Sequence, residues 1–510
     1  MWSPTPAHQA SRRRHTDGPL RMRVRYALLC LAMTCAVGGV PGARAAAISC
    51  GDTYRQPGWV AAENQRAGTA AWRIPTAKLG GIEGYADHVS AQCGDVVRLY
   101  VSTSAPYFRV VAYRMGYYQG LGARQIWQSG PHAGFSQSTP QPTSTTNTIE
   151  ANWRPSVAFT VDGSWPPGDY LLRLISSDNT SEHYIPLTVR DDLSTSSLIL
   201  QNDVSTWQAY NDWGGYSLYH GVDGFADRSR IVSYDRPYRY ASQSSGGQGD
   251  GEFLLYDYPL VRFVEELGLD ASYWTDIDLH ERPGLVLNHR ALITMSHDEY
   301  WSTQMRSGVE TALARGINLA FFGADAVQWV TRFQSSPLGP DREQIVYKSA
   351  SEDPLTGRDD ANVSVRFRDP PVSDPQSKLI GEQSDCSAVN ADMVITDASH
   401  WIFAGSGLTD GSVLPKMVGY ESDRIDGYPH PGDLQTLASS PFLCGSRTWS
   451  SNMTYYTGAS GAGVVATGTI SWLCVLTASC KQISGNAGNQ PVVRQVTKNI
   501  LERFAAGPAG

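Results

Sequence analysis

Residues 291–301 read ALITMSHDEYW, and this stretch decides the fold. Its first five residues, 291–295, are apolar or uncharged, and a run of this length suits a buried strand. From 301 to 315, apolar residues recur at three- and four-residue steps, which predicts an amphipathic helix. Sites in open α/β sheets lie beyond the carboxyl ends of strands. We therefore expect chemistry in the polar residues 296–300.

The surrounding sequence alternates in the same way from about residue 195. We expect strands at 197–200 and 317–322 and a helix at 259–267, which together predict a largely parallel sheet covered by helices. Residues 463–472 are typical of β structure, and the apolar positions of 492–504 suit a closing helix docked on the sheet.

Three stretches follow predicted strands: 203–219, 296–301 and 323–329. If the strands are neighbours, these stretches meet at one edge of the sheet. The first is rich in tyrosine beside Gly214 and Gly215, a pattern more often found in cores or sugar-stacking surfaces than in metal sites. The residue types of a serine triad occur at 296–298, but adjacent side chains point in different directions and cannot relay a proton. The chain has no HExxH, GxSxG or Walker sequence.

Residues 46–192 have a different character. Short β-rich runs at 96–101, 108–113 and 170–175 are separated by turn formers, which predicts an antiparallel β-sandwich. Within it, 114–124 reads RMGYYQGLGAR. We interpret this as a glycine-permitted hairpin whose aromatic residues pack on a neighbour; a ligand-binding loop or a contact to the second domain is the alternative. The second domain is expected to span 193–510.

The first 45 residues have the features of a secretory signal. Six arginines precede an apolar stretch at 26–40, and Ala43-Arg44-Ala45 has the form of a cleavage site. The apolar stretch is shorter than the ~20 residues that a membrane span needs, and no later segment is long and apolar enough. Without residues 1–45, which hold seven Arg and one Asp, the 41 basic and 49 acidic residues become 34 and 48, a net charge of −14. This charge argues against nucleic acid or anionic lipid as a partner. We expect a secreted, extracellular protein.

Six cysteines follow the signal, and an even number in an exported chain predicts three disulfides. The chain contains no CxxC pair, so the cysteines do not indicate a metal site. We expect Cys50 to pair with Cys93, and the other four to pair among themselves in a connectivity that the sequence leaves open: Cys386, Cys444, Cys474 and Cys480.

Several spaced motifs resemble the large (beta) subunit of N,N-dimethylformamidase and its exported relatives. They are TWQAYNDWGGYSLY, SHDEYW, FFGADAVQW, VGYESDR and GAGVVATGTISW, and RMGYYQGLGAR extends the resemblance into the β domain. The resemblance implies a core like that of class I glutamine amidotransferases without the nucleophilic cysteine. It also implies a mononuclear iron held by two tyrosines and a glutamate.

Carried over by position, the resemblance implies Tyr210, Tyr219 and Glu299 as metal ligands, with Tyr238 as the fallback for Tyr219. It places His297 beside the metal and makes Glu421 a candidate catalytic carboxylate. Asp325 stands where the family has an asparagine near the metal, so the chain departs from the family's pattern there. An additional carboxylate could change proton transfer, substrate polarity or metal affinity.

This ligand set suits ferric iron, a hard cation that favours anionic oxygen donors. Binding lowers the pKa of a phenol far below its usual ~10, so two phenolates and one carboxylate balance three positive charges. Three protein ligands leave positions for water and a substrate carbonyl. His297 or Glu421 would take the proton of the water and pass it to the departing amine.

Each residue also has a structural explanation. Glu299 could cap the following helix, His297 could hydrogen-bond within its turn, and Glu421 could pair with Arg424 at the surface. We predict a metal-dependent hydrolase of a small amide or related C–N bond. The alternative is a non-catalytic cell-surface or glycan-binding protein whose aromatic cleft stacks on sugars; a conventional serine or cysteine hydrolase is third. Whether the chain forms a homo-oligomer or needs a small partner subunit stays open.

Overall fold

The computed structural model describes residues 49–239, 251–425, 427–477 and 485–510. Residues Ile48–Gly510 form one compact unit, a mixed α/β structure with several sheets. The predicted signal and Cys480 lie outside the described residues. Within the described ranges, no helix combines the length and the apolar character needed to cross a membrane.

Two antiparallel-rich sheets are built from the first part of the described chain. One has the order β1-β3-β7, and the other has the order β2-β9-β8-β4-β5 with β6 paired to β4. Residues of both sheets share one apolar cluster, which includes Leu99 and Leu172. The predicted strands at 96–101, 108–113 and 170–175 are confirmed as parts of β3, β4 and β8. The bounds are β1 Ile82–Ala86, β2 Ser90–Gln92, β3 Val96–Thr103, β4 Tyr107–Met115, β5 Ala123–Gln128, β6 His132–Ala133, β7 Val157–Thr160, β8 Gly168–Ser176 and β9 Glu182–Arg190.

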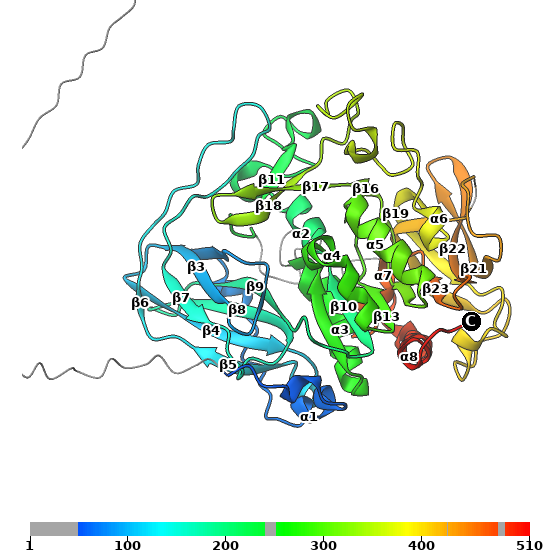
Figure 1. The fold of residues 1–510 in the computed structure, drawn as a ribbon, viewed down its shortest axis with the longest axis horizontal. Helices are drawn as coiled ribbons and strands as arrows, with labels where there is room; N and C mark the ends of the chain where they lie inside the picture. Colours follow the sequence, from blue (N-terminus) through cyan, green and yellow to red (C-terminus); the bar gives the residue numbers. More distant parts are fainter. Residues whose placement is uncertain (1–48, 240–250, 426, 478–484) are drawn as a thin grey trace, which may run out of the picture. The chain divides into compact units, whose positions relative to one another are not determined.

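A seven-stranded sheet carries the later part of the chain, in the order β12-β10-β13-β15-β23-β22-β21. Figure 1 labels β10, β13, β23, β22 and β21 of this sheet. The first five strands pair in parallel, and β22 and β21 continue the sheet antiparallel. The bounds are β10 Leu198–Asn202, β12 Ala271–Thr275, β13 Ala291–Thr294, β15 Asn318–Phe321, β21 Gln435–Cys444, β22 Arg447–Thr457 and β23 Gly463–Ala466. The predicted parallel strands are therefore confirmed, with ends shifted by one or two residues.

Both faces of this sheet are covered. Ile293 of β13 belongs to one apolar cluster and its neighbour Leu292 to another, as expected when successive side chains point to opposite faces. Apolar residues of α3 and α8 join the first cluster, and those of α5 join the second. This double cover explains why the strands read as unbroken apolar runs rather than as alternating ones.

The helices match most of the predicted positions. The predicted helices at 259–267 and 492–504 lie within α3 and α8. The residues 471–472, expected in a β-rich stretch, instead begin α7. The bounds are α1 Trp59–Asn64, α2 Val204–Tyr210, α3 Tyr258–Leu267, α4 Asp276–Glu281, α5 Thr303–Ala314, α6 Ser377–Ile380, α7 Ser471–Val475 and α8 Gln490–Ala506.

The helix predicted from residue 301 starts later, because Ser302 caps α5: its hydroxyl accepts a hydrogen bond from the backbone N–H of Met305 over 3.1 Å. Tyr300–Trp301 forms the short strand β14, which pairs in parallel with β16, Trp329–Val330. The remaining strands form two small sheets, β11-β18-β17 and β19-β20. Their bounds are β11 Ile231–Ser233, β17 Arg332–Ser336, β18 Gly339–Ile345, β19 Gln383–Val394 and β20 Val413–Arg424.

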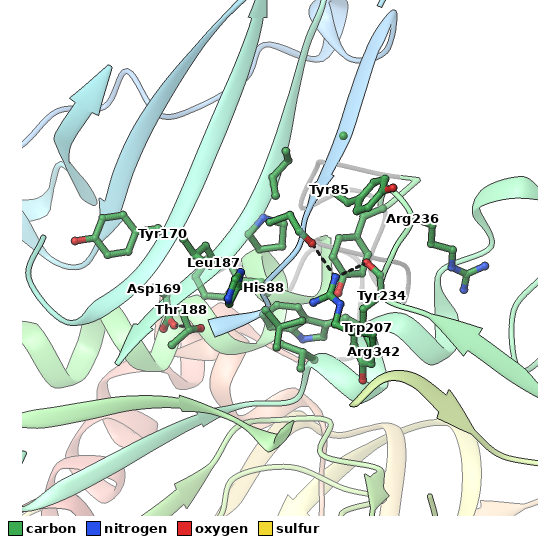
Figure 2. A pocket seen from close by; sticks show the side chains of 18 residues that line it. Tyr85, His88, Asp169, Tyr170, Leu187, Thr188, Trp207, Tyr234, Arg236 and Arg342 are labelled. Atoms are coloured by element: carbon green, nitrogen blue, oxygen red, sulfur yellow. Dashed lines mark hydrogen bonds between the residues drawn. The ribbon is translucent and has the colours of Figure 1, made fainter. Parts of the chain in front are cut away.

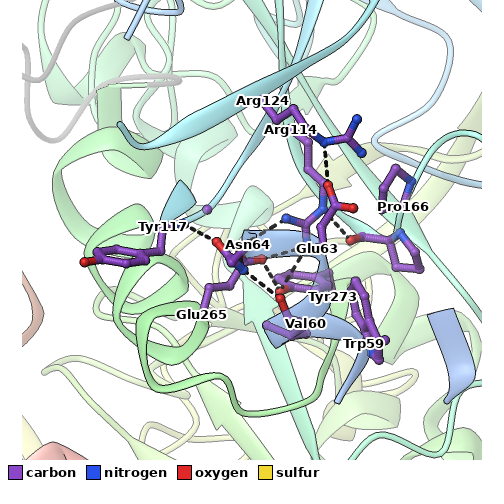
Figure 3. Close-up of polar contacts among 12 residues, drawn as sticks. Trp59, Val60, Glu63, Asn64, Arg114, Tyr117, Arg124, Pro166, Glu265 and Tyr273 are labelled. Atoms are coloured by element: carbon purple, nitrogen blue, oxygen red, sulfur yellow. Dashed lines mark hydrogen bonds and ion pairs between the residues drawn. The ribbon is translucent and has the colours of Figure 1, made fainter. Parts of the chain in front are cut away.

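The RMGYYQGLGAR stretch is a hairpin between β4 and β5 that also contacts the later part of the chain. Arg114 is fully buried and lies 2.7 Å from Glu265 of α3, and its guanidinium also contacts Tyr118 and Tyr273 (Figure 3). A Cβ at Gly116 would lie 2.0 Å from a carboxylate oxygen of Glu265, so only glycine permits this approach. This segment is therefore a hairpin, as predicted, and it also makes the contact to the second predicted domain that was the alternative.

Two disulfides are present among the described residues. Cys50 pairs with Cys93, as predicted, and Cys386 of β19 pairs with Cys444 of β21. The second pair settles part of the connectivity that the sequence left open.

Candidate metal and catalytic site

The three stretches that follow β10, β13 and β15 meet, as predicted, at one edge of the sheet. Their strands are direct neighbours and run parallel. Glu299 joins the stretches: its N–H donates to Thr206 Oγ1 over 3.1 Å, and its carbonyl accepts from Trp329 N over 2.9 Å. A Cβ at Gly323 would lie 1.5 Å from the carbonyl oxygen of Ser296, so the chain after β15 can pass there only as glycine.

A pocket of about 260 Å³ opens at this edge. Apart from the fallback Tyr238, it is lined by five of the six residues singled out in the sequence; the sixth, His297, is buried and contacts Glu421 of the lining. The lining residues are Tyr210, Tyr219, Glu299, Asp325, Gln328, Trp329, Arg366, Arg368, Ser384, Asp385, Cys386, Ser387 and Glu421.

Two phenols and one carboxylate lie together in this pocket. The rings of Tyr210 and Tyr219 stack with centroids 4.5 Å apart, and Tyr219 donates to Glu299 Oε1 over 2.6 Å. Burial first, and then the charge of Glu299, raise the pKa of both phenols well above 10. The phenols are therefore protonated in this state, and a cation would be needed to ionise them.

Glu299 has an oxygen available for such a cation. Its Oε1 accepts from Tyr219, from Trp329 Nε1 over 2.9 Å and from Gln328 Nε2 over 3.2 Å. Its buried Oε2 has no hydrogen-bond partner among the described residues and lies 3.6 Å from His297 Nε2. A buried carboxylate oxygen without a partner is costly unless a cation or water satisfies it, so the residues fit a metal ion. Glu299 does not cap α5, since Ser302 does.

A histidine and two carboxylates form a second donor group beside the phenols. Ligand atoms of His297, Asp325 and Glu421 lie within 4.8 Å of one another, and all three side chains are buried. His297 Nε2 lies 3.1 Å from Glu421 Oε2, and His297 Nδ1 lies 3.4 Å from Glu252 Oε2. Glu421 thus contacts His297 rather than Arg424, which pairs with Asp385.

Opposing effects set the pKa values of this group. Burial by itself lowers the pKa of His297, but the carboxylates of Glu421 and Glu252 outweigh burial and raise it well above 6.5. Burial, followed by the charges of Glu421 and Asp423, raises the pKa of Asp325 well above 3.8. Asp325 Oδ2 accepts from Gln328 Nε2 over 3.1 Å. The site therefore holds an imidazole whose protonated form is favoured and a carboxyl group whose ionised form is disfavoured.

Tyr238, the fallback ligand, lies elsewhere. It lines a separate cavity of about 30 Å³, which has room for about two waters. Tyr85, Tyr234 and Trp207 supply aromatic walls, and Asp169 supplies a buried carboxylate (Figure 2). No other residue singled out as a ligand or catalytic group lines this cavity, so Tyr219 is the tyrosine that the fold places with Tyr210 and Glu299.

Sequence reasoning missed several residues of the site. Lys348 Nζ lies 3.8 Å from the ring centroid of Tyr219, and its ammonium donates to Tyr300 Oη over 2.5 Å. Burial lowers the pKa of Lys348 to about 7. Tyr300, Gln328 and Trp329 were inside quoted motifs and could have been chosen from them. Lys348 and Glu252 carry no local signal, because packing alone brings them to the site.

The family model "N,N-dimethylformamidase beta subunit-like, C-terminal" matches residues 109–485. The search of curated proteins returned no match. The family match begins within β4, so it includes the Arg114 hairpin as well as all the pocket residues. Because the match covers more than half of the chain, the protein belongs to the N,N-dimethylformamidase beta subunit-like family.

Proposed function

We propose that this protein is an exported, metal-dependent hydrolase of a small amide or related C–N bond. Family membership supports an amidohydrolase. The observation that carries the proposal is the convergence of Tyr210, Tyr219 and Glu299 on one pocket. The proposed scaffold is a β-sandwich over 46–192 followed by a glutamine amidotransferase-like domain over 193–510.

In this proposal Tyr210, Tyr219 and Glu299 hold a mononuclear ferric iron. When bound, the ion would polarise the amide carbonyl and acidify a water molecule. The phenols would give up their protons on binding it, and Glu299 would offer Oε2, the oxygen that has no hydrogen-bond partner among the described residues. Trp329 and Gln328 hold Glu299 in this orientation through Oε1.

His297 and Glu421 are the proposed proton carriers. They lie 3.1 Å apart, and Glu252 holds the other ring nitrogen of His297. Glu421 would accept a proton from the attacking water, and His297 would supply one to the departing amine. Asp325, which is hydrogen-bonded to Gln328, would orient the substrate or share a proton with Glu421.

Metal analysis of the purified full-length protein, combined with a visible spectrum and an assay of amide hydrolysis, tests the proposal. We expect about one iron per chain, a phenolate-to-iron absorption band and hydrolysis that stops when the metal is removed. Iron without the absorption band would instead favour the His297, Asp325 and Glu421 group as the metal ligands.

The second function to test is glycan binding by the aromatic cleft without a metal. A colourless protein that takes up no iron but binds polysaccharide would support it and would contradict the hydrolase proposal. Export is tested separately by the position of the mature N-terminus, and a homo-oligomer or a small partner subunit by the mass of the assembly in solution.

A further inference from the structure

Two arginines line the candidate catalytic pocket, and neither holds the metal nor carries protons in the proposed function. Arg366 and Arg368 flank Phe367 in the segment between β18 and α6. A guanidinium group beside a small pocket can bind an anionic group of a substrate if its hydrogen-bond donors are not already occupied by the protein.

Arg368 is committed to the protein. Its side chain is only 11% exposed, and its guanidinium lies 2.9 Å from Asp385, which also pairs with Arg424 over 2.7 Å. Arg368 also donates to the carbonyl oxygen of Ser384. These contacts hold the wall formed by β19 and β20.

Arg366 is available. Its side chain is 38% exposed, and Asp369 is its one ion-pair partner within the described ranges. The two residues are three positions apart in the sequence, and Arg366 Nε lies 2.9 Å from Asp369 Oδ2. Their side chains are about equally exposed. Exposed pairs of this kind contribute about 0–1 kcal/mol, so a ligand anion can compete with Asp369 for the guanidinium.

The backbone fixes where Arg366 sits. Residues 365–367 run antiparallel to residues 328–330: Val330 N donates to Val365 O and Phe367 N donates to Gln328 O, each over 2.9 Å. Arg366 therefore lies opposite Trp329, with its guanidinium carbon 5.6 Å from the indole centroid. Since the indole N–H donates to Glu299, one tryptophan side chain separates the guanidinium from the proposed metal ligand.

Burial defines a direction within the pocket. The side chain of Glu299 is 2% exposed, whereas that of Arg366 is 38% exposed. The carboxylate of Glu299 thus lies at the base of the pocket, and the guanidinium of Arg366 lies toward solvent. A substrate that fits this polarity presents its carbonyl to the base and an anionic group to the outside.

We propose that Arg366 selects amides that carry a carboxylate, with N-acyl amino acids as the substrate class. This inference rests on the proposed amide hydrolysis and names its substrate. The acyl C–N bond lies toward Glu299, and the carboxylate accepts two parallel hydrogen bonds from the guanidinium. A neutral amide as small as N,N-dimethylformamide leaves Arg366 without a ligand.

Calorimetric titration with a matched pair of ligands tests the inference. N-acetylglycine and N-acetylglycinamide differ in one charged group, and binding is measured on the full-length protein at neutral pH, independently of turnover. We expect the wild type to bind the acid at least tenfold more tightly than the neutral ligand. Arg366→Gln is expected to remove this preference by lowering the affinity for N-acetylglycine alone. Arg366→Lys is expected to keep part of the preference, because lysine supplies the charge without the planar guanidinium.

Arg315→Gln is the matched control, because Arg315 is exposed at the end of α5 and does not line the pocket. It should leave both affinities within twofold of the wild type. The inference would be overturned if the wild type bound the two ligands equally or bound neither. It would also be overturned if Arg366→Gln lowered the affinities for both ligands by the same factor. Hydrolysis is followed in parallel: selective binding of the acid without cleavage of any amide would keep the inference on recognition and contradict the proposed activity.

Discussion

Tyr219 donates its phenol hydrogen to Glu299 Oε1 over 2.6 Å, although 80 positions separate the two residues along the chain. Tyr300 donates in turn to Tyr219 Oη over 2.7 Å, and Lys348 donates to Tyr300. This chain of donors ends on the carboxylate that the proposal assigns to the metal. The proton on Tyr219 is therefore shared with the group that would bind the ion next to it.

Replacing Tyr219 by phenylalanine should reduce the iron content and weaken the phenolate absorption band, because one of the proposed anionic donors is lost. Tyr238→Phe is the control, since Tyr238 lines the separate 30 Å³ cavity. It should leave metal content and spectrum unchanged. Elemental analysis and visible spectroscopy of the two variants measure this; equal effects would contradict the ligand assignment.

Replacing Arg114 by glutamine should lower the free energy of unfolding by about 3–5 kcal/mol, because it leaves the buried carboxylate of Glu265 without its cation. Arg109→Gln on the exposed face of the same strand should change it by less than about 0.5 kcal/mol. Urea denaturation measures both. The double variant Arg114→Gln with Glu265→Gln should recover part of the loss, and no recovery would show that the ion pair is not the cause.

Asp169 makes stability depend on pH. Burial raises the pKa of its carboxyl group to about 7, against about 4 in an unfolded chain. Between these values the folded state binds more protons than the unfolded state, so stability falls as pH rises from about 4 to 7 and then levels off. Asp169→Asn should remove a decline on the order of 4 kcal/mol.

Denaturation of wild type and Asp169→Asn at pH 5 and pH 8 measures the part of this decline that lies above pH 5, about 2–3 kcal/mol. The difference between the two proteins isolates Asp169 from other buried acids, such as Asp203 and Asp423. Asp223→Asn, at an exposed position, should reproduce the wild-type decline. An unchanged decline in Asp169→Asn would contradict the raised pKa.

The two observed disulfides should differ in their effect on activity. They close loops of 43 and 58 positions, for which chain entropy predicts nearly equal stabilisation, about 4 kcal/mol each. Cys386 lines the candidate catalytic pocket, whereas Cys50 and Cys93 do not. Serine at both 386 and 444 should therefore lower kcat/KM, while serine at both 50 and 93 should lower stability alone. Kinetics and thermal unfolding separate the two results, and equal kcat/KM in both variants would contradict a role for the Cys386 wall.

The strands and helices that enclose the site were predictable because their physical signals are local. The apolar run of β13 and the spacing of Met305, Val309 and Ala312 in α5 identify a buried strand and an amphipathic helix without knowledge of the rest. The pairing of β14 with β16 was not predictable, because two-residue strands carry no periodic pattern. It nevertheless moved Trp301 out of the predicted helix.

The site itself was predictable only in part. The order of the parallel strands placed Glu299 and Asp325 at one edge, which follows from general rules for α/β sheets. Glu421 came from the family resemblance, since nothing in the neighbourhood of β20 distinguishes it from a surface acid. Lys348 and Glu252 could not be found, because their proximity to the tyrosines and to His297 depends on the packing of distant segments.

The buried Arg114–Glu265 pair has a practical consequence for work with fragments of this protein. A fragment beginning at residue 193 would contain Glu265 and Tyr273 but no guanidinium to compensate them. Such a fragment would also lack Asn64 and the rest of the segment that buries Glu265, so it would expose to solvent an acidic surface that the full chain covers. Fragments and fusions of this protein should therefore keep residues 49–190 attached, even if these residues contribute no atom to the proposed reaction.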